Sequence, residues 1–137
     1  MEFEQHSRRR TGILGELGEH IIAGNFEGMQ LYDKKYHQKV SGKHPKLGRV
    51  HIICRLPGKF EDKNREPKLV QVSRIDFNHF IFGLFDDYYN LTQLRVLSSS
   101  QFIKLASKQG GRYRVTVKQL LEQPETAIVI NPSGYGA

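Results

Sequence analysis

The 137-residue chain contains a single cysteine and no tryptophan. One cysteine, Cys54, excludes an internal disulfide framework and a zinc site built from several thiolates. Its surroundings, Val50-His51-Ile52-Ile53-Cys54, predict a buried thiol in a strand, because an unpaired cysteine usually packs as a small hydrophobe. This cysteine usage is typical of a reducing compartment, and we expect a cytoplasmic location.

Long apolar runs and acidic residues are also scarce. No segment approaches the ~18 apolar residues of a membrane-spanning helix, and Met1 to His6 contain no apolar core of a secretory signal. We therefore expect no membrane partner. The 14 Asp and Glu are outnumbered by 21 Lys and Arg, which leaves a net charge of +7. Such a surplus favours nucleic acid as the partner, because basic side chains neutralise phosphates and release counterions.

Helical spacing of apolar residues predicts one helix over 12–23. Leu14, Leu17 and Ile21 form one stripe, Thr11 is a plausible N-cap, and Gly24-Asn25 a plausible stop. Glycines at 12, 15 and 18 recur close to one face of this helix. They weaken the isolated helix by about 1 kcal/mol each, and they allow another backbone, or the phosphates of a ligand, to approach closely.

The rest of the chain predicts strands followed by two further helices, in a single domain over 1–137 with flexible ends at 1–9 and 131–137. The most apolar run, 79–85, is typical of a central strand buried on both faces, and 91–97 of its antiparallel neighbour. Ser98-Ser99-Ser100 indicates a helix over 100–108 that ends at Gly110-Gly111, and Thr116 one over 116–122. The other expected strands are 29–33, 49–55, 68–72 and 127–130, with a hairpin or mobile loop at 34–48 and an exposed connection at 56–67.

Three acidic residues are candidates for chemistry. Glu16 and Glu19 are three positions apart and therefore lie on nearly the same side of the first helix, and Asp33 ends the following strand. A helix glutamate, a strand-end aspartate and a polar residue of the adjoining strand can converge on one divalent ion. Mg²⁺ prefers such oxygen ligands and supports phosphodiester cleavage.

Four segments together resemble the PD-(D/E)XK, or restriction-endonuclease-like, nucleases. The similarity covers about residues 10–106 and implies an α/β/α sandwich with a small mixed central sheet. It rests on the order and local pattern of Gly15-Glu16-Leu17-Gly18-Glu19-His20, Tyr32-Asp33, Gly48-Arg49-Val50-His51-Ile52-Ile53-Cys54-Arg55, and Asp76-Phe77 followed by Ile81 to Asp87.

The resemblance implies Glu19, Asp33 and His51 as catalytic residues, with Glu19 and Asp33 as the ligands of Mg²⁺ if the protein is active. His51 stands where the family has Glu or Gln, and Ile53 stands where it has the catalytic lysine. That lysine orients or activates the attacking water and offsets negative charge, which isoleucine cannot do. Either the lysine has moved, or the matching strand is Gln71-Val72-Ser73, or the protein binds nucleic acid without cutting it. Candidates for a moved lysine are Lys35, Lys39, Lys43 and Lys46.

Each of these residues also has a plain structural interpretation. Glu16 and Glu19 would then be solvent-facing helix charges, and Asp33 would open an Asx turn. His51 would be a core or edge histidine with its hydrogen bonds satisfied.

The phosphate-contacting candidates are basic residues that gather in a few places. The main ones are Arg8, Arg9, Arg10, Lys34, Lys35, Lys39, Lys43 and Lys46; Lys108, Arg112 and Arg114 flank the second predicted helix. Aromatic residues among them, Tyr32, Tyr36 and Tyr113, are suited to stacking on bases.

We therefore predict a nucleic-acid-binding protein that is catalytically weak or inactive, with DNA favoured over RNA. An active Mg²⁺-dependent endonuclease with a relocated lysine is the first alternative, and a small adaptor for an acidic protein is the second. Nuclease folds of this size often pair, so the resemblance also implies a possible homodimer.

Overall fold

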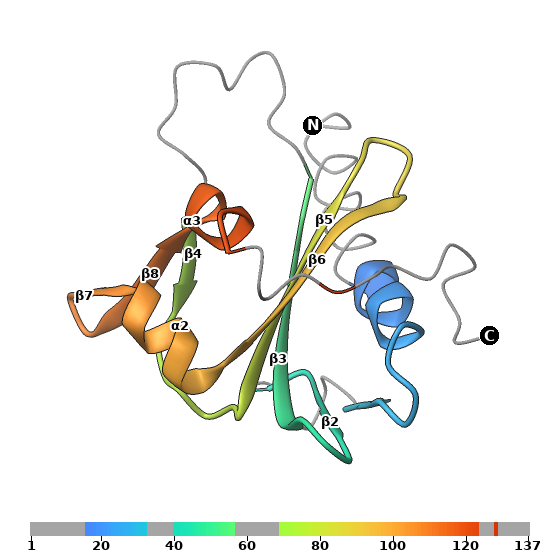
Figure 1. Ribbon diagram of the computed structural model, residues 1–137, viewed down its shortest axis with the longest axis horizontal. Helices are drawn as coiled ribbons and strands as arrows, with labels where there is room; N and C mark the ends of the chain where they lie inside the picture. Colours follow the sequence, from blue (N-terminus) through green and yellow to red (C-terminus); the bar gives the residue numbers. More distant parts are fainter. Residues whose placement is uncertain (1–15, 33–39, 57–68, 124–127, 129–137) are drawn as a thin grey trace, which may run out of the picture.

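Two β-sheets and three helical segments make up the part of the chain that the computed structural model describes, residues 16–32, 40–56, 69–123 and 128. The larger sheet has the strand order β1-β2-β3-β5-β6, and the smaller one has the order β4-β8-β7 (Figure 1). The first helix covers residues 16–23 of the described chain. The other elements are β1 (Gln30–Leu31), β2 (Gly42–His44), β3 (Gly48–Arg55), β4 (Leu69–Val72), β5 (His79–Phe85), β6 (Leu91–Ser98), α2 (Ser99–Leu105), β7 (Ser107–Gln109), β8 (Arg112–Thr116) and α3 (Val117–Leu121).

The larger sheet is mixed, as expected. β3 and β5 run parallel, whereas β1, β2 and β3 form an antiparallel series and β6 pairs antiparallel with β5. β5 lies between β3 and β6, and Phe80, Ile81 and Phe82 are completely buried. The predictions of a doubly buried strand at 79–85 and of its antiparallel neighbour are therefore confirmed.

The first helix covers one face of the larger sheet (Figure 1). Ile22 packs there in a cluster with Val50, Ile52, Ile81, Phe85 and Leu94, and Cys54 contacts its edge. A Cβ atom on Gly18 would lie only 2.6 Å from the Cys54 sulfur, so the glycine lets the helix approach the sheet closely. The helix stops at Gly24-Asn25, where the Gly24 N–H donates to the His20 carbonyl at 3.0 Å. The predicted helix end is confirmed. At Gly18, the close approach allowed by the glycine is that of the sheet.

The smaller sheet and helices α2 and α3 cover the opposite face. Phe80, Phe82 and Leu97 of the larger sheet form a second cluster with residues of this layer, namely Val70, Val72, Val115, Phe102 and Leu120. The α/β class with a mixed central sheet is thus confirmed. The α/β/α sandwich implied helices on this face; three strands, of which the sequence predicted only the one at 68–72, lie there beside them.

The strands β7 and β8, which the sequence did not predict, lie on either side of Gly110-Gly111. α2 starts as predicted, with Ser98 as N-cap in a capping box with Gln101, but it ends at Leu105 rather than at 108. The two glycines form the turn of a hairpin between β7 and β8, not the end of a helix. A two-residue glycine loop is a strong hairpin signal. α3 begins at its predicted N-cap, Thr116.

Of the remaining predictions, some are met in part and others concern residues outside the described ranges. The strand expected at 29–33 is shortened to β1, and part of the 34–48 loop is a hairpin, with β2 pairing to β3. In the segment 127–130, only Ile128 is described, and its N–H donates to the Leu94 carbonyl at 3.0 Å. The flexible ends at 1–9 and 131–137 and nearly all of the connection at 56–67 lie outside the described residues. Within the described chain, no helix is long and apolar enough to cross a membrane.

Candidate nucleic-acid interface

The two glutamates of the first helix differ in their surroundings. Glu19 is buried, with 7% of its surface exposed, beside the Gly18 contact with the sheet. Glu16 is exposed. The interpretation as a solvated charge is therefore confirmed for Glu16 and wrong for Glu19.

His51 lies on the other face of the larger sheet. Its ring stacks on Phe77 and Phe80, with ring centroids 5.6 and 6.0 Å apart. Its strand neighbours Val50 and Ile52 belong to the cluster under the first helix, because successive side chains of a strand point to opposite faces. The sheet thus separates His51 from the helix that carries Glu19.

These placements bear directly on the expected magnesium site. Glu19 and His51 do not fit as ligands of one ion, since the sheet lies between them, and Asp33 is outside the described residues. No group of three or more His, Cys, Asp or Glu side chains suited to a metal occurs in the described part of the chain. Ile53 packs against the second apolar cluster, on the same face as His51.

Two of the predicted phosphate contacts, Lys43 and Lys46, are exposed on the β2–β3 hairpin. His44 holds this hairpin in place. Its Nδ1 accepts from the backbone N–H groups of Lys46 and Leu47 at 3.1 and 3.2 Å, and so its Nε2 donates to the Glu27 carbonyl at 2.8 Å. Both ring nitrogens are used within the fold. Arg8, Arg9, Arg10, Lys34, Lys35 and Lys39 lie outside the described residues.

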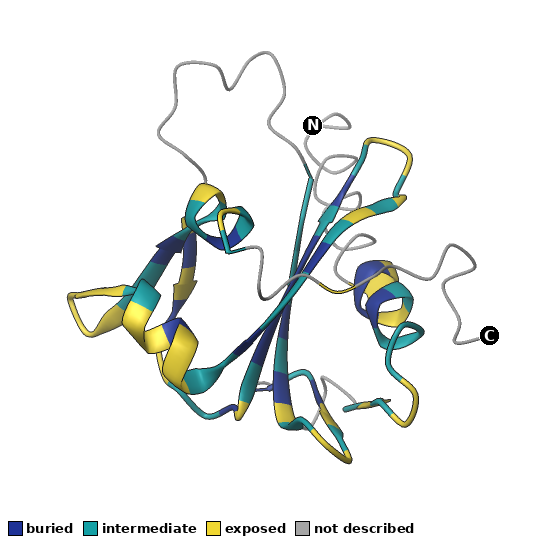
Figure 2. Ribbon diagram, viewed as in Figure 1, coloured by how far each residue is buried: buried dark blue, intermediate teal, exposed yellow. Residues whose placement is uncertain are grey.

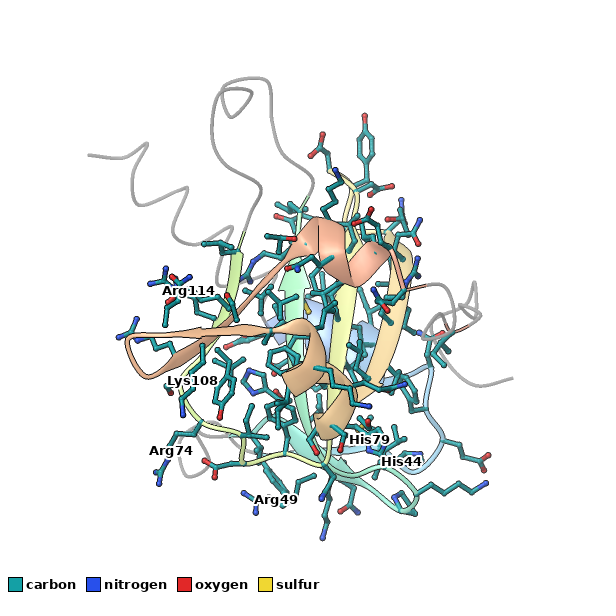
Figure 3. All side chains as sticks on the ribbon, turned by 60° about the vertical axis from the view of Figure 1, so that its left-hand side comes forward. His44, Arg49, Arg74, His79, Lys108 and Arg114 are labelled. Atoms are coloured by element: carbon teal, nitrogen blue, oxygen red, sulfur yellow. The ribbon has the colours of Figure 1, made fainter. Side chains whose placement is uncertain are left out.

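Side-chain and backbone hydrogen bonds also tie together the starts of β3 and β5. The Nδ1 of His79 donates to the Leu47 carbonyl at 2.7 Å. Asn78 accepts from the Arg49 N–H at 2.9 Å and donates its own N–H to the Arg49 carbonyl at 2.8 Å. These residues position Arg49, which is exposed at this end of the sheet (Figure 3).

The smaller sheet presents a second, more uniform basic surface. Val70, Val72 and Val115 point into the core, so the alternate side chains of the same strands form an outer face. This outer face consists of Leu69 and Gln71 of β4, Arg112, Arg114 and Thr116 of β8, and Ser107 and Gln109 of β7. β4, β7 and β8 contain no Asp or Glu.

The two arginines of the outer face are bonded to neutral side chains. Arg112 donates to the amide oxygen of Gln71 at 3.4 Å, and Arg114 donates to that of Gln109 at 3.3 Å. The Nε of Arg114 is buried and has no hydrogen-bond partner among the described residues. Within the part of the chain that the structure describes, neither guanidinium group is paired with a carboxylate.

Two further cations lie beside the smaller sheet. Lys108, on the inner side of the edge strand β7, places its ammonium 5.4 Å from the centroid of the Tyr113 ring. Arg74 follows β4 and is exposed. Figure 3 shows Arg114, Lys108 and Arg74 along one side of the molecule. The sequence identified Lys108, Arg112 and Arg114 as candidates but assigned them to the flanks of a helix.

Other charged residues serve the fold. Burial lowers the pKa of Arg55, whose Nη1 donates to the Cys54 carbonyl at 3.0 Å. Arg95 donates to the Leu121 carbonyl at the end of α3 at 3.3 Å, a favourable place for a cation. The Asn90 backbone N–H, donating to Asp86, holds the pKa of that carboxyl below its usual range.

The chain matches no protein-family model, and no curated protein matches it significantly.

Proposed function

We propose that this protein binds nucleic acid, DNA in preference to RNA, through the outer face of the smaller sheet, and that it does not cleave its ligand. We further propose that its fold is restriction-endonuclease-like. The order of elements supports this assignment. A helix at 16–23, a strand just before 33, β3 over 48–55 and β5 over 79–85 occur where the resemblance requires them.

The observation that carries the binding proposal is the absence of carboxylates from β4, β7 and β8, whose outer face displays Arg112 and Arg114. A guanidinium paired with a carboxylate would have to break an ion pair before it contacted a phosphate. Among the described residues, each arginine would give up only a long hydrogen bond to a glutamine amide. Arginine also binds phosphate with two parallel hydrogen bonds, which makes it well suited to this role.

Two placements support binding without cleavage. Ile53 packs against an apolar cluster at the position where the family carries its lysine, and His51 stacks on the Phe77 and Phe80 rings on the face away from Glu19. A plasmid-nicking assay with Mg²⁺ or Mn²⁺ tests this part. We expect no nicking by the wild type. Nicking that is lost in both Glu19→Ala and Asp33→Ala would instead establish the active endonuclease.

A binding titration tests the interface itself. We expect the double variant Arg112→Gln/Arg114→Gln to weaken binding of a labelled duplex about tenfold or more, and to reduce the slope of log K against log salt by about 2. Its matched control is Lys104→Gln/Lys118→Gln, which removes the same charge from exposed positions of α2 and α3. Equal losses in the two variants would show that net charge, and not the outer face, determines binding.

The same titration separates nucleic acid from an acidic protein as partner. An adaptor for an acidic protein would give no salt-dependent binding of DNA or RNA at submicromolar protein. The cytoplasmic location and the homodimer stay predictions; sedimentation of the free protein tests the second.

A further inference from the structure

The hairpin of β7 and β8 extends beyond the third strand of its sheet. β4 pairs with β8 only as far as Val72 opposite Tyr113. Past that point Gln109 pairs with Arg112 alone, followed by the turn at Gly110-Gly111. The end of the smaller sheet is therefore a two-stranded ribbon, and Figure 1 shows its turn directed away from the rest of the described chain.

The two glycines of the turn suit its backbone conformation, which has positive φ angles. Gly110 and Gly111 have φ angles of +59° and +78°. These values correspond to a type I′ turn, whose twist matches that of the flanking strands. A Cβ atom at either position would meet no atom of the described chain within 4 Å. The tip is thus open, and its backbone can approach a partner closely.

Cations occupy both faces of the β7–β8 hairpin. Arg112 lies at its two-stranded end, whereas Lys108 and Arg114 lie one and two residue pairs further in, where β4 also pairs with β8. Arg112 and Arg114 lie on its outer face, whereas Lys108 lies on the inner face over Tyr113. All three residues of β7 are exposed, and β7 is an edge strand. A groove with phosphates along both walls would meet positive charge on either side of the ribbon.

We infer that the β7–β8 ribbon enters the major groove of duplex DNA, an inference that rests on the proposed nucleic-acid binding. Gln109 and Arg112, at the tip, reach the base edges, while Lys108 and Arg114 contact the phosphates of the walls. The major groove of B-DNA is about 12 Å wide and admits a two-stranded ribbon. Strands in such a ribbon are about 4.8 Å apart, which leaves room for side chains on both sides.

The residue types at the tip fit this groove. Arginine reads the O6 and N7 acceptors of guanine, and glutamine reads the N6 and N7 positions of adenine. The major groove of an RNA duplex is too deep and narrow for such contacts. The outer face carries no aromatic ring on which single-stranded bases would stack, because the one aromatic residue of β8, Tyr113, packs toward the core.

The test compares a DNA duplex with the same duplex whose cytosines carry a glucosylated 5-hydroxymethyl group, which fills the major groove. We expect the modified duplex to bind about tenfold or more weakly. Saturation of the minor groove with distamycin should leave the affinity nearly unchanged. Equal affinity for the two duplexes would overturn the inference while leaving nucleic-acid binding intact. No salt-dependent binding of any probe would overturn both proposals.

A variant series assigns the effect to the ribbon. Arg112→Gln should weaken binding of the unmodified duplex but leave that of the glucosylated duplex nearly unchanged, because its contact is already blocked there. Lys104→Gln, on the exposed side of α2, should affect both duplexes equally. A thermal melt of each variant verifies the fold. If Arg112→Gln also weakens both duplexes equally, the ribbon does not lie in the groove.

Discussion

The two sheets of this protein bury their strands in different ways. In β5 of the larger sheet, every residue from Phe80 to Gly83 is buried, whereas all three residues of β7 in the smaller sheet are exposed. Figure 2 shows the contrast between the buried centre of the larger sheet and the exposed β7. The larger sheet is covered on both faces, by the first helix and by the layer of the smaller sheet. Among the described residues, the smaller sheet is covered on one face only.

This difference separates stability from binding. A strand covered on both faces must be apolar throughout, and replacing its residues costs stability. A strand covered on one face needs apolar residues only at alternate positions, as in β8 with Val115 buried and Arg112 exposed. The free face can then carry arginine at little cost to the core. Four substitutions with progressively smaller effects probe this contrast.

Phe80→Ala should produce the largest loss. Phe80 is completely buried, and its ring lies 4.6 Å from that of Phe102. Truncation of such a side chain lowers the free energy of unfolding by about 3–5 kcal/mol. Urea denaturation of wild type and variant measures this difference. Tyr88→Ala is the control, because Tyr88 is 85% exposed, and it should change stability little. Similar losses in both variants would contradict the burial described.

Gly83→Ala tests how closely the first helix packs on the larger sheet. The added Cβ would lie 2.5 Å from Cδ1 of Ile22, which is completely buried and has little room to move. Overpacking of this kind costs about 1–3 kcal/mol. The combination with Ile22→Val should recover part of the loss in urea denaturation. A double variant less stable than Gly83→Ala would show that the two residues do not crowd each other.

Gly111→Ala tests the tip of the smaller sheet. The cost here comes from the positive φ of +78° and not from crowding, since no atom of the described chain lies near. We expect a loss of about 1 kcal/mol in thermal unfolding. Gly111→Asn should lose less, because asparagine tolerates this conformation better. Equal losses for alanine and asparagine would argue against a conformational cause.

Asp86→Asn should have the smallest effect on stability, and that effect should depend on pH. Hydrogen bonds, first from the Asn90 backbone and then from the Asn90 side chain and the Tyr88 backbone, lower the pKa of Asp86 in the β5–β6 turn. A carboxyl with a lowered folded-state pKa stabilises the protein above its unfolded pKa of about 3.9, and the contribution disappears as the pH falls through the folded value. The difference in Tm between wild type and variant should therefore shrink between about pH 5 and pH 2. A constant difference would show that the charge of Asp86 plays no part.

The local features of the fold could be predicted from the amino-acid sequence alone. The apolar run of β5, the Ser98 and Thr116 caps and the helix end at Gly24-Asn25 each depend on a few neighbouring residues, and the structure contains all of them. The charge surplus and the basic residues around Gly110-Gly111 were also visible. Capping, turn chemistry and hydrophobic period are short-range effects, which a single sequence displays directly.

Which residues share a face depends on the tertiary packing and could not be predicted from the sequence. Whether His51 or Ile52 faces the first helix depends on the parity of the strand, and one residue of shift would exchange them. The outer face exists because Gln71 of β4 pairs with Arg114, far away in the sequence. Such pairings depend on the packing of the whole core, and it is this packing that places Glu19 and His51 apart and gathers the arginines into one surface.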